Sequence, residues 1–118
     1  MRRAFLICPV RGHDPHDYAE VVAVLEQRGW TLHYPPRDTN QDDATRYRIC
    51  ADNRAAIEAA ERVFVIWDGQ SQGGLFDLGM AFALHKPITV LDAPPRTEGK
   101  SFQNMMHEWQ QEVTPCES

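Results

Sequence analysis

The sequence contains no apolar run long enough to cross a membrane, and the apolar stretch after residues 1–3 is too short for a signal peptide. It also lacks an excess of basic residues: 12 lysines and arginines face 17 aspartates and glutamates, for a formal net charge of −5 at pH 7. Unspecific binding to nucleic acid requires a basic face. We therefore expect a protein that binds neither membranes nor nucleic acid, although local arginines can still hold a small anion.

Cysteines are few and irregularly spaced. The three of them, Cys8, Cys50 and Cys116, form no CxxC pair and stand in no zinc-ligand spacing with a histidine. This pattern predicts a reduced, cytoplasmic protein without a disulfide framework or a zinc site. Two histidines and two aspartates lie within residues 13–17. These residues are compatible with a metal-binding loop, although a solvated loop is the more typical interpretation.

Strand and helix patterns alternate along the chain. A length of 118 residues suits one domain, and no repeat or low-complexity segment divides it. Short apolar runs predict strands at residues 4–8, 30–34, 63–67 and 88–91. Helical spacing predicts helices at about residues 15–28, 44–60, 75–83 and 101–112, with a polar loop at residues 37–43. This order predicts an α/β fold: one flavodoxin-like or Rossmann-like domain over residues 1–118, with a parallel sheet and helices on both faces.

The third predicted strand leads into the most informative stretch of the chain. Residues 68–74 hold three glycines, so the chain turns there before an apolar helical pattern begins. The carboxyl end of a parallel sheet, just before such a helix, is where open α/β proteins bind ligands. Asp77 stands one turn into this helix. It is either a reactive carboxylate or a residue that complements the helix N-terminus electrostatically.

Further polar side chains are expected at the same edge of the sheet, because the loops after parallel strands open on one side. Those that converge near Asp77 are Arg11, Arg37, Asp68 and Ser71. Arginine, serine and backbone N–H groups at a helix N-terminus form an anion site. Arg11 can alternatively be a solvated loop cation. Asn53 interrupts the apolar stripe of the second helix, either as a functional group or as a hydrogen-bonded core amide.

Residues 71–81, Ser-Gln-Gly-Gly-Leu-Phe-Asp-Leu-Gly-Met-Ala, resemble the glycine-rich segment of the nucleoside 2-deoxyribosyltransferase superfamily. The family pattern is an acidic or hydroxyl residue, a glycine-containing turn, an aromatic residue and then Glu-Leu-Gly-x-Ala. Its glutamate attacks the anomeric carbon of a nucleoside. Asp77 takes that place here, so the resemblance implies that Asp77 is the nucleophile. The resemblance is strong in this segment and weak over most of the chain.

The same resemblance implies a phosphate on the substrate. Relatives that use free nucleosides have an aspartate six residues before the nucleophile, where relatives that hydrolyse nucleoside 5′-monophosphates have a serine; this chain has Ser71. A carboxylate there would repel a phosphate. Val10-Arg11-Gly12 also resembles the Ile-Arg-Gly of those hydrolases, whose arginine lies by the phosphate. Ser71 and Arg11 together favour a nucleotide over a nucleoside.

Two positions depart from the family pattern. Asn53 aligns with an acidic residue that contacts the nucleobase and helps to protonate it, and an amide cannot act as a general acid. Asp77 is one methylene shorter than the family's glutamate, and a displacement of ~1 Å can cost on the order of 10²-fold in rate. The backbone could approach the sugar more closely, or a water could attack with Asp77 as the base. The sequence leaves both open.

The last predicted helix resembles the segment in which the family's Asn-Leu-Met-Ile places an asparagine into a neighbouring subunit's site. Asn104 takes that position, where the monophosphate hydrolases carry serine. One side of this helix carries large apolar residues, Phe102, Met105, Met106 and Trp109. Such a face suits a symmetric interface. We expect a homodimer or a dimer of dimers.

These patterns predict an enzyme that cleaves the N-glycosidic bond of a nucleoside 5′-monophosphate, or a close derivative, by a retaining carboxylate mechanism. Asp77 and Asn53 are the expected catalytic residues. The expected substrate-binding residues are Arg11, Gly12, Arg37, Asp68, Ser71, Gly73, Gly74 and Asn104. The implied partner is a small nucleotide or nucleoside, with no metal or redox cofactor. Two alternatives stay open: a 2-deoxyribosyltransferase that moves the sugar between bases, and a non-catalytic nucleotide-binding or sensing domain.

Overall fold

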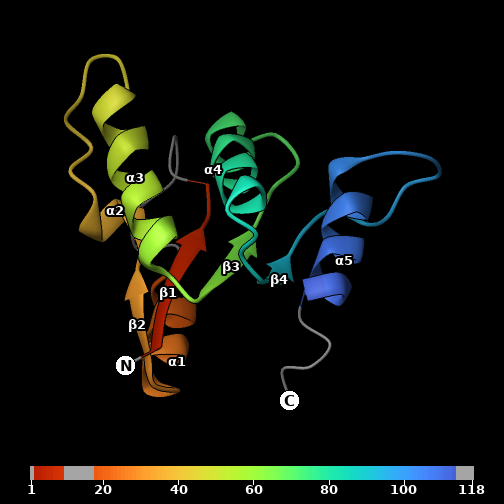
Figure 1. Ribbon diagram of the computed structural model, residues 1–118, viewed down its shortest axis with the longest axis horizontal. Coiled ribbons are helices and arrows are strands. Elements are labelled where there is room, and N and C mark those ends of the chain that lie inside the picture. Colours follow the sequence, from red (N-terminus) through yellow and green to blue (C-terminus); the bar gives the residue numbers. More distant parts are fainter. Residues whose placement is uncertain (1, 10–17, 114–118) are drawn as a thin grey trace.

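The computed structural model describes residues 2–9 and 18–113, and four parallel strands form its sheet in the order β2-β1-β3-β4 (Figure 1). The strands are β1 (Arg2–Ile7), β2 (Trp30–His33), β3 (Arg62–Ile66) and β4 (Ile88–Asp92). Every residue of the central strand β3 is buried, as expected for a parallel strand covered on both faces. The predicted parallel α/β sheet is therefore confirmed.

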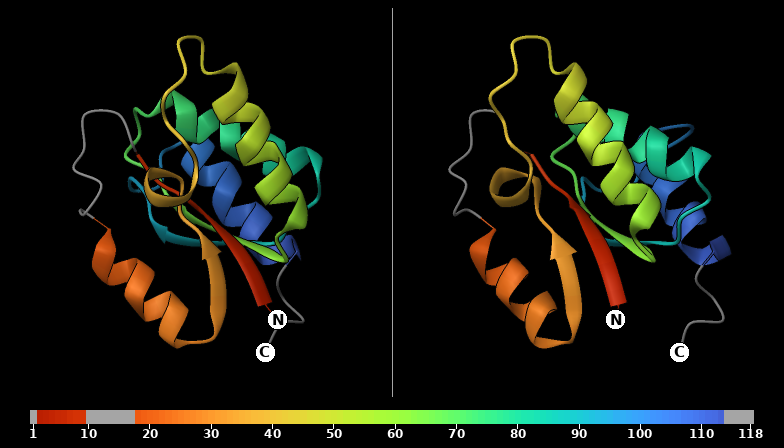
Figure 2. Two further views of the ribbon diagram at one scale, coloured as in Figure 1. Left: turned by 90° about the vertical axis from the view of Figure 1, so that its left-hand side faces the viewer. Right: turned by 60° about the vertical axis from the view of Figure 1, so that its left-hand side comes forward.

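Helices cover both faces of this sheet (Figure 2). On one face, α1 (Ala19–Gln27) buries Val22 and Leu25 against the sheet. On the other face, α3 (Tyr47–Ala59) and α4 (Gln72–Ala83) bury Ile57 and Leu78 in a second apolar cluster. Side chains alternate along a strand, so β1 feeds Leu6 into the first cluster and its neighbours Phe5 and Ile7 into the second. The two clusters fix α3 and α4 side by side on one face.

The last helix, α5 (Phe102–Val113), lies beside β4 and contributes to the chain's own core. Met106 and Trp109 are buried, and the Trp109 indole N–H donates to the Lys86 carbonyl at 3.0 Å. The expectation of one exposed apolar face is therefore wrong for these two residues, because they fill the space between α5 and the sheet. Phe102 remains 53% exposed. The homodimer stays a prediction.

The segment after β2 forms the predicted polar loop only from residue 39 onward. Its first residues form a short helix, α2 (Pro35–Asp38), with proline at the first positions, where the missing N–H needs no partner. The Asp38 carboxylate accepts a hydrogen bond from the Tyr34 N–H at 2.8 Å and closes the turn. This turn changes the direction in which Arg37 leaves the backbone.

Helix α3 begins at Tyr47, later than the sequence predicted, and the Asp43 side chain binds its first free N–H groups from outside the helix. The Asp43 carboxylate accepts hydrogen bonds from the N–H groups of Arg48 and Ile49, at 2.8 and 3.2 Å. Arg46, just before the helix, has left-handed backbone angles, φ 72° and ψ 0°. That conformation is uncommon for a residue with a side chain and is often found at functional sites. Arg46 lines the pocket at the carboxyl end of the sheet.

Candidate active site

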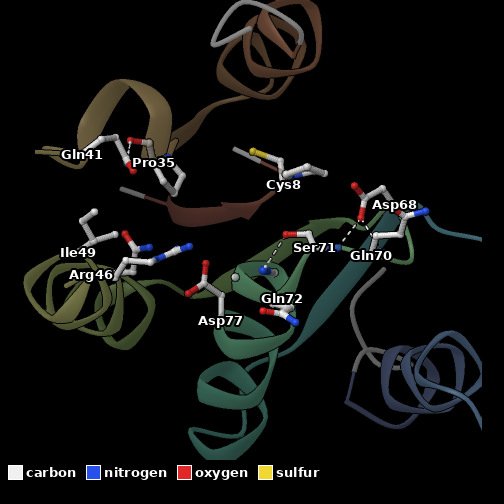
Figure 3. Close-up of a pocket in the computed structure, with 14 residues that line it drawn as sticks. Cys8, Pro35, Gln41, Arg46, Ile49, Asp68, Gln70, Ser71, Gln72 and Asp77 are labelled. Atoms are coloured by element: carbon white, nitrogen blue, oxygen red, sulfur yellow. Dashed lines mark hydrogen bonds between the residues drawn. The ribbon is translucent and has the colours of Figure 1, made fainter. Parts of the chain in front are cut away.

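A polar pocket opens at the carboxyl end of the sheet, between α3 and the turn that precedes α4 (Figure 3). Its volume is about 390 Å³, within the range of small-molecule sites. The sequence-predicted residues that line it are Asn53, Asp68, Ser71, Gly73, Gly74 and Asp77. The structure therefore brings together residues that lie far apart along the chain.

The turn between β3 and α4 is held by its own hydrogen bonds. The Asp68 carboxylate accepts from the backbone N–H groups of Gln70 and Ser71, at 2.9 and 2.7 Å. Ser71 is the N-cap of α4, because its Oγ accepts from the Gly74 N–H at 3.1 Å. Ser71 acts as an acceptor in that bond, so its own hydroxyl proton is free to be donated elsewhere. A neutral donor and the N-terminus of a helix together favour an anion in the pocket.

Asp77 lies in the first turns of α4, is half-buried and lines the pocket. Burial raises the pKa of Asp77 from 3.8 to about 7, while the charge of Arg46 and a hydrogen bond from Asn53 act in the opposite direction. Near pH 7 the carboxyl is therefore a mixture of its neutral and charged forms. This is typical of a catalytic carboxyl group and not of an exposed residue that complements a helix end.

Arg46 is a charged residue of this pocket that the sequence did not predict. Its side chain and that of Asp77 point toward one another from opposite sides of the pocket (Figure 3). Its guanidinium also lies against the start of α4, where a β-carbon on Gly73 would be 3.0 Å from Nη2. Arg46 belongs to no motif. The only available signal was its place in the segment after the second strand, which opens at the ligand edge.

Asn53 is a buried amide on α3, with 4% of its surface exposed. Its Oδ1 accepts a hydrogen bond from the Thr39 hydroxyl at 2.8 Å, and its amide group donates to the Asp77 carboxylate. Asn53 is thus both a hydrogen-bonded core amide and a direct neighbour of the candidate nucleophile. The core amide that the sequence left open is therefore confirmed, and a functional role for Asn53 stays a prediction.

Arg37 does not line this pocket, and this corrects the expectation that it lies near Asp77. Its guanidinium donates to the carboxylates of Glu26 and Asp38 and to the Leu32 carbonyl, at 3.1, 2.8 and 3.0 Å. The cause is the turn α2, which directs Arg37 toward α1 and away from the ligand edge. Arg11 and Gly12 lie outside the described residues.

Asn104 fastens the loop before α5 in its own chain and does not line the pocket. Its Nδ2 donates to the carbonyls of Thr97 and Gly99 at 2.8 and 2.7 Å, and its Oδ1 accepts from the Thr97 N–H at 3.1 Å. This placement leaves the expected contribution to a neighbouring subunit's site as a prediction. Any such contribution has to come from a side chain that already holds residues 97–99 in place.

Cys8 lines the pocket at the end of β1, but its thiol is not a nucleophile. Burial and the nearby charge of Asp77 raise the pKa of Cys8 to about 12, so the reactive thiolate is not formed near neutral pH. Across residues 2–9 and 18–113, no group of three His, Cys, Asp or Glu side chains is placed to hold a metal ion. The segment 13–17, where the sequence left a metal-binding loop open, is outside that range. Within the same described parts of the chain, no helix has the length and hydropathy that a membrane crossing requires.

Together, the parallel sheet and the pocket define a flavodoxin-like α/β protein whose carboxylate site lies at the start of the helix after the third strand. A sequence model of the nucleoside 2-deoxyribosyltransferase family matches residues 5–109. The chain belongs to this family, and it is an enzyme of the glycosidase or transferase kind.

Among solved structures, the chain is similar to the CMP N-glycosidase BcmB of Clostridium botulinum. The TM-score is 0.58 at 18% sequence identity, and the match covers 90% of this chain and 81% of that chain. At this identity the similarity shows the fold. No curated protein matches the sequence.

Proposed function

We propose that this enzyme cleaves the N-glycosidic bond of a nucleoside 5′-monophosphate, with Asp77 as the nucleophile. The observation that carries the proposal is the poised carboxyl of Asp77, held between Arg46 and Asn53 and next to the Ser71-capped start of α4. The family supports action on a nucleotide or nucleoside. The neutral hydroxyl of Ser71 and the helix N-terminus favour the phosphorylated form.

The chemistry follows the retaining carboxylate mechanism. One Asp77 oxygen forms a bond to the anomeric carbon while the bond between that carbon and the base nitrogen breaks. The electron pair goes to the base, which takes up a proton from water. A second water then attacks the anomeric carbon, gives one proton to the hydroxide left by the first water, releases Asp77 as a carboxylate and leaves a free 5-phosphosugar. Arg46 favours the charged form of Asp77 in which this cycle begins and ends.

The phosphate is assigned to the turn before α4. Ser71 can donate its hydroxyl proton, the amides of Gly73 and Gly74 lie at the helix N-terminus, and Asp68 holds the turn in shape. Arg11, which the family resemblance places by the phosphate, is part of the same proposal. Asn53 has a second amide hydrogen beyond the one that faces Asp77, and this hydrogen is available to the base.

The decisive experiment is a product analysis by chromatography. The protein is incubated with 5′-monophosphates, CMP among them because BcmB acts on it, and with the matching nucleosides, each with and without a free acceptor base. Free base from a monophosphate alone supports the proposal. A new nucleotide or nucleoside that forms only with the acceptor indicates a 2-deoxyribosyltransferase. Binding without turnover indicates a sensing domain.

Variants of Asp77 connect the activity to this residue. Asp77→Asn keeps the shape but cannot form the charged nucleophile, so turnover should fall to background. Asp92→Asn, which removes an exposed carboxylate at the end of β4 and outside the pocket, is the matched control and should retain activity.

Asp77→Glu restores the family's residue. It should keep or raise activity if the sugar sits as in the family, and lose activity if the pocket has closed around the shorter side chain. A fully active Asp77→Asn would refute the assignment.

A further inference from the structure

A chain of hydrogen bonds runs from the sheet to Asp77. The His33 Nε2 lies 2.7 Å from the Thr39 Oγ1, and that Oγ1 lies 2.8 Å from the Asn53 Oδ1. The Asn53 amide is in turn hydrogen-bonded to Asp77. Thr39 and Asn53 are each 4% exposed, so their hydrogen bonds are shielded from water. The members come from β2, from the segment after α2, from α3 and from α4.

The direction of each hydrogen bond in this chain is determined by simple valence. The Thr39 hydroxyl has one proton, and it is donated to the Asn53 Oδ1. The same oxygen can therefore only accept from His33, which must carry its proton on Nε2. With its oxygen occupied, Asn53 presents its N–H₂ group to Asp77. All donors in the chain point toward the candidate nucleophile.

The first member is itself held in place. The ring of His33 stacks on the ring of Phe5, with centroids 5.3 Å apart and an angle of 8° between the planes. Phe5 and His33 are register partners in the pairing of β1 with β2. The charged groups around His33 are Asp38 and Arg37 from α2 and Asp52 from α3. His33 is therefore a fixed donor at the end of a rigid strand.

We propose that His33 and Thr39 are positioning residues that hold the Asn53 amide with its N–H₂ group toward Asp77. This inference rests on the proposed function, in which Asp77 attacks as a carboxylate. A free amide can turn by 180° and present its oxygen to Asp77, which would repel the charged form. Thr39 disfavours that rotation, because its buried hydroxyl proton would lose the Asn53 oxygen as its acceptor.

The first test reads the tautomer of His33 by ¹⁵N NMR at pH 8. Burial lowers the pKa of His33 from 6.5, so the ring is neutral at this pH. The proposal requires a protonated Nε2 and an unprotonated Nδ1. The opposite tautomer would overturn it, because Thr39 would then donate to His33 and not to Asn53.

The second test replaces the hydroxyl and follows the ¹³C signal of the Asp77 carboxyl during a pH titration. Thr39→Val should raise the pKa of Asp77 by about one unit, because the charged form loses an oriented donor. Thr39→Ser restores the hydroxyl and should restore the wild-type titration. Thr31→Val, an exposed threonine on β2, is the matched control and should change nothing. An identical Asp77 titration in wild type and Thr39→Val would overturn the proposal.

Kinetics add a readout that a purely structural role would not produce. For Thr39→Val, kcat at pH 7 should fall about fivefold with little change in KM, because the charged fraction of Asp77 falls from about one half to about one tenth, and activity should recover as the pH rises. His33→Gln keeps an N–H donor and His33→Leu does not, so the second should resemble Thr39→Val and the first wild type. If the wild-type protein cleaves no nucleotide, the proposed function fails. The NMR titration still decides the positioning roles in that case.

Discussion

The Arg46 Nη2 atom lies 3.0 Å from the point that a β-carbon on Gly73 would occupy. The glycine is needed here for close approach and not for its backbone angles, since Gly73 is a regular residue of α4. Its missing side chain lets a guanidinium rest on the first turn of α4 and face Asp77. The Gly-rich turn thus has a second consequence besides its shape: it admits the charge of Arg46, which lowers the pKa of Asp77 while burial raises it.

Gly73→Ala tests this relationship. The added methyl group should push the flexible end of Arg46 away while leaving the fold intact. The pKa of Asp77 should then rise from about 7, because an opposite charge within reach commonly lowers a carboxyl pKa by about 1–3 units. NMR titration of Asp77 gives the measurement.

Gly79→Ala is the control on the same helix, since a β-carbon there meets nothing within 4 Å. It should stabilise the fold by about 0.5–1 kcal/mol and leave Asp77 unchanged. Equal Asp77 titrations in the two variants would contradict the assigned role of Gly73.

Asp77 should make the fold less stable as the pH rises. Between pH 4 and 7 the native state keeps a proton on Asp77 that the unfolded chain has released, because its pKa is raised from 3.8 to about 7. The unfolded state binds fewer protons in this window, so stability falls with increasing pH. Asp77→Asn removes this penalty and should be more stable than wild type at pH 8 by up to roughly 4 kcal/mol, and similar to it at pH 4. Urea unfolding of both proteins at the two pH values measures the difference. A gain that is equal at pH 4 and pH 8 would show that Asp77 titrates normally.

Ser71→Asp should discriminate between substrates. Aspartate is also a good N-cap, so α4 should remain capped. The added charge should weaken binding of a 5′-monophosphate by a few kcal/mol and leave a free nucleoside nearly unaffected. Isothermal titration with both ligands gives the comparison. Ser101→Asp is a matched control, because Ser101 caps α5 in the same way, accepting from the Asn104 N–H at 3.1 Å. Unchanged monophosphate affinity in Ser71→Asp would show that the phosphate lies elsewhere.

The fold could be predicted from the sequence because its signals are local. The buried strands are continuous apolar runs, and glycine and serine residues indicate the turn before α4. Arg37 and Arg46 could not be placed in this way. One short helix, α2, sends Arg37 to Glu26, and one left-handed residue brings Arg46 to Asp77. Backbone changes at single residues leave almost no trace in composition or spacing.

The dimer remains a prediction, but the exposed residues that support it are not the ones expected from the sequence. Two of the four apolar residues expected at an interface, Met106 and Trp109, belong to the core of the chain. Three phenylalanines remain outside, Phe76, Phe82 and Phe102, exposed by 56%, 58% and 53%. We expect a dimer at micromolar concentration by light scattering, and Phe102→Ser should shift it toward the monomer. A monomeric wild-type protein would exclude Asn104 from any neighbouring site.

The central place of β1 also has a consequence for how the chain folds. In the sheet, Phe5 pairs with both His33 and Val63, so the earliest strand lies between one close and one distant partner in sequence. Non-local parallel pairing is slow, because a long loop has to close before its contacts form. While β3 has not yet been synthesised, β1 can pair only with β2. We therefore expect the pocket, which needs α3 and α4 on the completed sheet, to be assembled late. Titration of the desolvated carboxyl of Asp77 would then report this late step of folding.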